Sequence, residues 1–200
     1  MIYITYLNKN ENENENNKHK IIKILKFKEI QNKAISNIIY IDCSRNFLDL
    51  SDNLKLVDLK KLICNNNEYI KLPNNMNILF PKLEILDCSF NDLSIFPQNL
   101  PDLTDFNCFS NNLTLLPNNI SELLPNLTIL NCGYNNLTSL PDNMNFKYLI
   151  EFYCCNNKLI SLPDNMFLPN LKIFNCNNNK LISLFDNIDK LLPKLSILYC

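Results

Sequence analysis

Apolar and polar residues follow one repeating pattern from residue 38 to the C-terminus. The unit reads L-x-x-L/F-x-C-x-x-N-x-L-x-x-L-P, as in LTILNCGYNNLTSLP from Leu127 to Pro141. The second apolar position and the cysteine are two residues apart, which predicts a short strand in every unit with both side chains on one apolar face. Complete, degenerate or truncated copies begin at Ile38, Leu59, Leu83, Leu103, Leu127, Leu149, Leu171 and Leu195.

The template cysteines measure the length of each unit. They are Cys43, Cys64, Cys88, Cys108, Cys132, Cys154, Cys176 and Cys200. With this short, regular period and these offsets, the chain resembles leucine-rich repeat proteins. Its L-P ending is also similar to the short bacterial repeats of some ubiquitin-ligase effectors. The resemblance implies an α/β leucine-rich repeat solenoid, with a curved parallel β-sheet on the concave side and short helical or extended convex segments.

The cysteine and asparagine of the unit predict two ladders inside this solenoid. Cys132 follows Leu130 by two residues, so both side chains should point into the core, where a cysteine behaves as a small apolar residue. Asn135 comes three residues later, where the chain leaves the strand. Its amide can bond the backbone groups that the turn leaves unpaired. We therefore expect a buried row of thiols beside a row of hydrogen-bonded amides.

The segments between the strands differ in character. Residues 97–102, PQNLPD, are short and predict an extended connection. Residues 117–126, PNNISELLPN, and 185–194, FDNIDKLLPK, carry apolar residues at a spacing that predicts about one helical turn on the convex side.

One repeat domain is expected, preceded by an N-terminal region. Residues 1–37 form an N-terminal region with a low-complexity Asn/Glu/Lys loop at residues 8–18 and a cap at residues 19–36, for which the pattern leaves strand and helix open. Residues 38–200 form the repeat domain of about 7.5 repeats, the last one truncated at Cys200. An uncapped last repeat would expose apolar surface, which leaves two interpretations open: a truncated gene, or self-association through that end.

Composition narrows the function further. A net charge of −1 removes the long-range attraction typical of a nucleic-acid binder, and no stretch is apolar for the length that spans a bilayer. We therefore expect no nucleic acid and no membrane as partner. The N-terminus carries no secretory signal pattern. We expect an intracellular, cytoplasmic protein, or one in the host cytoplasm if its source is a virus.

Catalytic chemistry has few candidate residues. The only histidine, His19, lies outside the repeats, so no base is at hand to ionise a template cysteine. Thiols in a row do not converge on zinc, and the single glycine, Gly133, rules out a glycine-rich phosphate loop. We predict no enzyme activity, no cofactor and no metal. Cys155 lies outside the ladder and should face the concave side.

The outer face of the predicted sheet is the candidate site. Template positions three, five and seven alternate with core positions and should face the concave surface, with Phe90 and Tyr134 just beyond. The candidate binding residues are Ile85, Asp87, Phe109, Ile129, Asn131, Tyr153, Ile173, Asn175, Ile197 and Tyr199. Tyrosines and large aliphatic side chains among amides fit a protein or peptide partner.

The resemblance implies a non-catalytic protein–protein interaction scaffold, and the predicted concave face agrees with it. Two alternatives stay open. One is the substrate-recognition part of a ubiquitin-ligase system, and the other is a structural or degenerate repeat protein from an expanded family with no specific partner.

Overall fold

The computed structural model of this protein describes residues 2–7, 19–24, 38–46, 50, 54–97, 99–184 and 187–200. The low-complexity loop predicted at residues 8–18 lies outside these ranges, as do the residues of the predicted cap from 25 onward.

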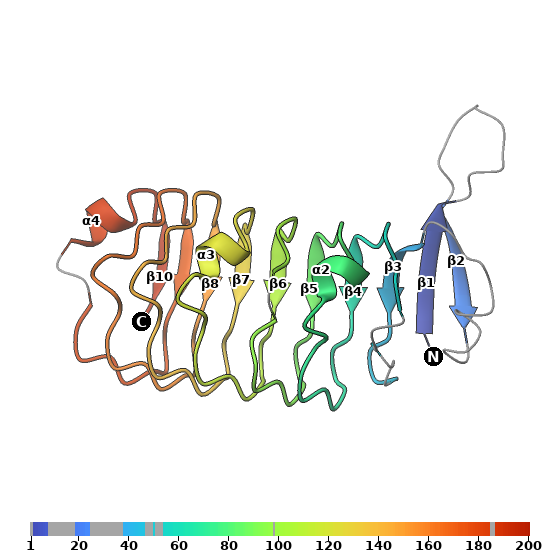
Figure 1. The fold of residues 1–200 in the computed structure, drawn as a ribbon. Helices are drawn as coiled ribbons and strands as arrows, with labels where there is room; N and C mark the ends of the chain where they lie inside the picture. Colours follow the sequence, from blue (N-terminus) through green and yellow to red (C-terminus); the bar gives the residue numbers. More distant parts are fainter. Residues whose placement is uncertain are drawn as a thin grey trace.

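One sheet runs through the described part of the chain (Figure 1). Its strands follow one another in sequence order along the solenoid, from β3 to β10, and each pairs in parallel with the next. The eight strands are β3 (Ile38–Asp42), β4 (Lys61–Ile63), β5 (Ile85–Asp87), β6 (Asp105–Asn107), β7 (Ile129–Asn131), β8 (Glu151–Tyr153), β9 (Ile173–Asn175) and β10 (Ile197–Tyr199). This arrangement confirms the predicted leucine-rich repeat solenoid and its strand in every unit.

An antiparallel hairpin extends the sheet beyond β3. It consists of β1 (Ile2–Leu7) and β2 (His19–Ile24), and β1 pairs with β3 from Tyr3 opposite Asp42. The first residues of the predicted cap therefore form a strand. Main-chain pairing of this kind occupies the open edge of a sheet. The capping role itself stays a prediction.

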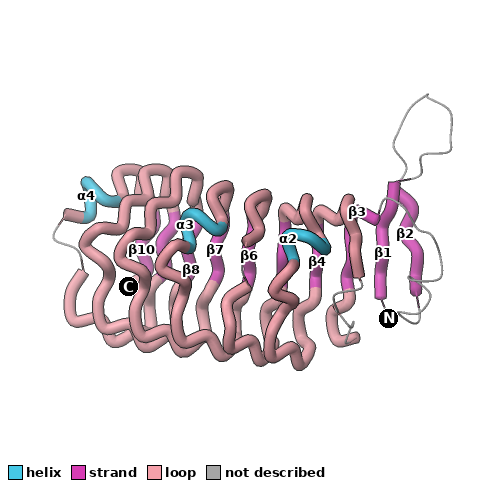
Figure 2. The backbone as a smooth tube through the Cα atoms, in the orientation of Figure 1, coloured by secondary structure: helices cyan, strands magenta, loops and turns pink. Residues whose placement is uncertain are grey.

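Within the described residues, three one-turn helices lie in the connections: α2 (Met76–Leu79), α3 (Ile120–Leu123) and α4 (Ile188–Leu191). Figure 2 shows that the described parts of the other connections are irregular. The helical turns predicted within 117–126 and 185–194 are confirmed, whereas α2 was not predicted.

Repeat length explains where the helices occur. Each helix falls in one of the longest intervals between template cysteines, which are Cys64–Cys88, Cys108–Cys132 and Cys176–Cys200. The shorter intervals hold no helix within their described residues. A helix rises about 1.5 Å per residue against about 3.3 Å for an extended chain. A connection that contains a helical turn therefore needs more residues to cross the same distance.

The core consists of the stacked apolar positions of the unit. Seven template cysteines, from Cys43 to Cys176, are at most 1% exposed, which confirms the buried thiol row. Several thiols bond to the next coil, for example Cys108 Sγ, which donates to the carbonyl of Asn131 at 3.3 Å. Cys200 was expected in the same row but is exposed, because no further coil packs against β10.

The asparagine row joins each coil to the one before it. Asn135 Nδ2 donates to the carbonyls of Cys132 and Gly133 in its own coil and to Cys108 in the preceding one, at 3.0 to 3.1 Å. Its Oδ1 accepts the backbone N–H of Leu113 at 3.0 Å. Equivalent bonds recur at Asn91, Asn111, Asn157 and Asn179. The predicted amide row is therefore confirmed.

Candidate functional site

The outer face of the parallel sheet carries two rows of side chains in strict register. Template position three of each strand pairs with position three of the next, as Ile129 does with Asp105 and Glu151, and position five behaves alike. From β4 to β9 the middle residue of each strand is buried and its two neighbours are half-buried. Alternation along the strand thus turns both rows toward the concave face.

The ten predicted site residues all occupy this face, although they differ in exposure. Ile197 and Tyr199 in the last strand are 40% and 49% exposed. The other eight are half-buried: Ile85, Asp87, Phe109, Ile129, Asn131, Tyr153, Ile173 and Asn175. Nothing in this placement tests whether they bind, so their role stays a prediction.

Carboxylates outnumber cations in the two rows. The two rows contain four carboxylates and one lysine. The carboxylates are Asp42, Asp87, Asp105 and Glu151. The lysine is Lys61, whose ammonium lies 5.7 Å from the Tyr40 ring centroid. Among the described residues, the ion pairs are Lys60–Glu84 and Lys82–Asp58, and neither includes a carboxylate of these rows. The concave face is therefore a negatively charged surface.

Two tyrosines of the rows are coupled to neighbouring acids. Tyr153 Oη donates to Glu151 Oε2 at 2.7 Å, and burial together with this contact raises the pKa of Tyr153 to about 12. Tyr40 lies beside Asp42 in the same way, and its pKa is raised by burial and by that carboxylate. Both phenols therefore stay protonated at neutral pH and can donate a hydrogen bond.

Three aromatic rings from successive coils meet at the end of β5, β6 and β7. The ring centroids of Phe90 and Phe109 are 5.4 Å apart, and those of Phe109 and Tyr134 are 4.8 Å apart. Phe90 is 50% exposed and Tyr134 is 52% exposed. We call these three residues the aromatic cluster. The sequence predicted only Phe109 as a site residue, because position eight lies outside the alternating rows.

Position eight of the unit has a special backbone conformation in every complete coil. Its φ lies between 52° and 57°, which is the left-handed region. The residues are Arg45, Asn66, Phe90, Ser110, Tyr134, Asn156 and Asn178. Asparagine tolerates this region better than bulky side chains do. The two exposed aromatic residues of the cluster therefore occupy positions that local backbone preference would give to asparagine.

The single glycine of the chain lies directly against the aromatic cluster. A Cβ atom on Gly133 would approach the Sγ of Cys155 to 3.0 Å and Cδ2 of Phe109 to 3.2 Å. The φ of Gly133 is not positive, so this position requires glycine for space and not for backbone freedom. Gly133 thus allows the Phe109 ring to lie close to the neighbouring coil.

The buried thiols of the cysteine row have little nucleophilic character. Burial raises the pKa of Cys132 and Cys154 well above the usual thiol value, and it raises the pKa of Cys176 to about 11. A neutral thiol is a poor nucleophile and metal ligand. Among the described residues, no three His, Cys, Asp or Glu side chains are grouped so that they could hold a metal ion.

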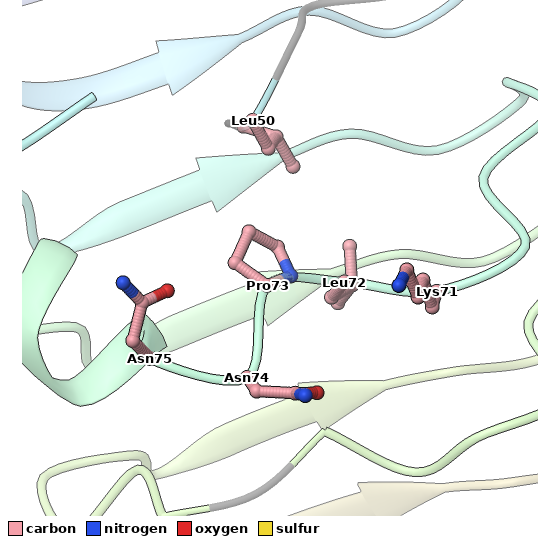
Figure 3. Close-up of a pocket in the computed structure, with 6 residues that line it drawn as sticks. All are labelled: Leu50, Lys71, Leu72, Pro73, Asn74 and Asn75. Atoms are coloured by element: carbon pink, nitrogen blue, oxygen red, sulfur yellow. The ribbon is translucent and has the colours of Figure 1, made fainter. Parts of the chain in front are cut away.

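A cavity of about 440 Å³ lies near the start of α2, outside the position-three and position-five rows (Figure 3). It is lined by Leu50, Lys71, Leu72, Pro73, Asn74 and Asn75. Among the described residues of this lining, Lys71 alone is ionisable. A second cavity, of about 370 Å³, lies beside Ile182 and Cys200 in the last coils. Self-association through that end stays a prediction.

None of the described helices has both the length and the apolar character that a bilayer crossing requires.

Comparison with known proteins gives structural matches only. No protein-family model matches the sequence, and no curated protein matches it. A leucine-rich repeat protein of Leptospira interrogans is 28% identical to this chain with a TM-score of 0.54, over 71% of this chain and 43% of that one. YopM, a leucine-rich effector protein from Yersinia pestis, is 29% identical with a TM-score of 0.53, over 71% and 43%.

A third match shares the fold alone. The structure of a TLR13 complex with ssRNA13 is 24% identical with a TM-score of 0.62, over 80% of this chain and 23% of that chain. This chain therefore spans less than half the length of each of these structures.

The repeat unit, the parallel sheet and the solved structures agree, and the chain is a leucine-rich repeat protein. Within that class, it carries a short unit with cysteine at the strand and asparagine at the turn. Solenoids of this class generally serve as scaffolds for interaction.

Proposed function

We propose that this chain is a non-catalytic scaffold that binds a protein or a peptide on its concave face. The observation that carries the proposal is the aligned row of large side chains on the outer face of the sheet. Ile173 lies in register with Ile197 on one side and with Glu151 on the other, and Ile129 follows in the next strand. A single exposed isoleucine on a strand is ordinary, but isoleucine at the same position in three of the four strands from β7 to β10 is typical of an interaction surface.

The chemistry of this face fits a polypeptide better than a nucleic acid. Tyr153 and Tyr199 provide aromatic anchors, and the amides of Asn131 and Asn175 provide donors and acceptors beside them. The carboxylates of the two rows would repel a phosphate backbone. We also propose an intracellular, cytoplasmic setting, because nine free thiols suit reducing surroundings.

A pull-down with matched variants tests the proposal. The wild-type protein is compared with the double variant Ile129→Lys, Tyr153→Lys in a lysate of the native host. The control is Ile160→Lys, Tyr148→Lys, in which the same residue types are replaced. Ile160 and Tyr148 are 57% and 44% exposed and lie outside the three concave rows. Circular dichroism first checks that all three proteins are folded.

Each outcome has a distinct meaning. A protein retained by wild type and by the control, and lost by the concave-face variant, supports binding through this face. Identical or empty sets from all three proteins would contradict it and favour a structural repeat protein without a partner. A ubiquitin-system adaptor among the specifically retained proteins would favour a substrate-recognition role in a ubiquitin-ligase system.

A further inference from the structure

Two residues of the aromatic cluster, Phe90 and Tyr134, adopt a backbone conformation that bulky side chains disfavour. Phe90 and Tyr134 keep half of their surfaces exposed, so they add little to the core. Both adopt the left-handed conformation that Asn66, Asn156 and Asn178 adopt at the same position of other coils. Residues held in unfavourable conformations without a packing reason are concentrated at functional sites.

The surroundings of the cluster hold its rings in place. Phe109 lies between the other two rings, at the centroid distances of 5.4 and 4.8 Å given above, which match the roughly 4.8 Å spacing of neighbouring strands. Gly133 leaves the space that the Phe109 ring needs beside Cys155. The three rings therefore form a fixed apolar platform at the edge of the concave face.

Asp87 lies one outward position from this platform on the same face, and Asp105 lies one position farther along β6. Asp87 is the register partner of Asn107, and Phe109 lies two residues beyond Asn107 on the same side of the chain. Asp105 lies two residues before Asn107. Successive outward positions are separated by about 7 Å along a strand and neighbouring strands by about 4.8 Å. One long side chain can therefore contact the rings and reach Asp87 together.

The Asp87 carboxylate is fixed by hydrogen bonds and forms no ion pair with a described residue. Its Oδ1 accepts the backbone N–H and the hydroxyl of Ser89 at 3.0 and 2.6 Å, and its Oδ2 accepts Asn65 Nδ2 at 2.9 Å. Asp105 has only a long contact, 3.4 Å from Thr104 Oγ1 to its Oδ2. Asp87 therefore presents negative charge one outward position from the Phe109 ring, and Asp105 adds charge farther along the same face.

We propose that the aromatic cluster, with Asp87, forms a site for an arginine in an extended peptide. This inference rests on the proposed function, since it names the chemistry of the partner on the same face. The planar guanidinium stacks on aromatic faces and forms paired hydrogen bonds with a carboxylate, which an ammonium group does less well. A phosphate or an acidic peptide would meet repulsion at the same place.

Peptide selection on the full chain tests this inference. Random dodecapeptides are selected by display on the wild-type protein, labelled with fluorescein and measured by anisotropy. Each selected peptide is then remade with citrulline in place of arginine, which keeps the planar shape and removes the charge. The protein variant is Phe90→Asn, Tyr134→Asn. It should fold, because asparagine already occupies the same left-handed position in three other coils.

A matched control removes an exposed ring elsewhere. Phe167 is 48% exposed and lies in a connection outside the concave rows, so Phe167→Asn loses an aromatic ring away from the site. We expect arginine-containing peptides whose affinity falls at least tenfold with citrulline and at least tenfold on the double asparagine variant. Their affinity for Phe167→Asn should equal that for wild type. Binding should also weaken as salt is added.

Other results separate the two proposals. Suppose the peptides bind equally well with citrulline, or bind the double asparagine variant as tightly as wild type. If they are still lost on Ile129→Lys, Tyr153→Lys, the arginine site is wrong and the scaffold function stands. If no peptide is selected, or if every concave-face variant binds unchanged, both the arginine site and concave-face binding are overturned.

Discussion

Replacing Asn135 with alanine should measurably loosen the connection between two neighbouring coils. The substitution removes the four hydrogen bonds of the amide, three from Nδ2 and one to Oδ1. The three carbonyls each keep another donor: Cys108 keeps Asn111 Nδ2, Cys132 keeps Asn157 Nδ2 and Gly133 keeps the N–H of Ser110. The unpaired group is therefore the buried N–H of Leu113.

The magnitude follows from that one orphaned donor. A buried donor left without an acceptor costs about 1 to 3 kcal/mol, so the free energy of unfolding should fall by this amount. Urea unfolding followed by circular dichroism measures the change. The neighbouring substitution Asn136→Ala is the control, because its half-buried side chain lies outside the amide row. We expect the control to change stability by no more than about 0.5 kcal/mol.

Amide hydrogen exchange gives a local measurement that does not depend on two-state unfolding. The N–H of Leu113 should exchange faster in Asn135→Ala, whereas that of Leu93, which bonds to Asn111 Oδ1, should be less affected. An unchanged exchange rate at Leu113, together with unchanged stability, would refute the reasoning that the amide row holds the coils together.

Other perturbations test the thiol row and the platform. Because burial raises the pKa of the seven template thiols from Cys43 to Cys176 above the 9.0 of an unfolded thiol, stability is fully present well below pH 9 and falls as pH rises above it; flat urea midpoints over pH 8–10 in reducing buffer would contradict this. Thiol labelling of the native protein should modify Cys200 first, Cys155 next and the seven buried thiols slowly. Cys132→Ser should lower the free energy of unfolding by about 1 to 3 kcal/mol, because it buries a hydroxyl. Gly133→Ala should lower stability by about 1 kcal/mol or more in the same assay, and less in a Cys155→Ala background, where the nearest clashing atom is absent.

The elements inside each coil could be predicted from the sequence of a single repeat. The strand, the buried cysteine and the bonded asparagine depend on residues a few positions apart, and stacking repeats them in register. The one-turn helices α3 and α4 were equally local, since their apolar spacing lies within one connection. Helix α2 was missed, although the long interval from Cys64 to Cys88 was a usable signal.

The candidate site was only partly readable for a different reason. Alternation places Ile129, Tyr153 and Ile173 on the outer face, and the structure agrees with that placement. Phe90 and Tyr134 escaped the pattern because position eight follows the strand and adopts a left-handed turn. Their contact with Phe109 joins three successive coils, whose residues are distant from one another in the sequence.

The sequence by itself determined the repeat, the parallel solenoid and the two internal ladders, because each coil repeats the same short-range alternation. Only the tertiary structure decided which side chains of different coils touch. It assembled the aromatic cluster over Gly133, set Asp87 in register with Asn107 near that cluster and paired β1 with the edge of β3. Such contacts depend on how neighbouring coils stack and on the room that each residue leaves for the next, and neither is contained in the pattern of one repeat.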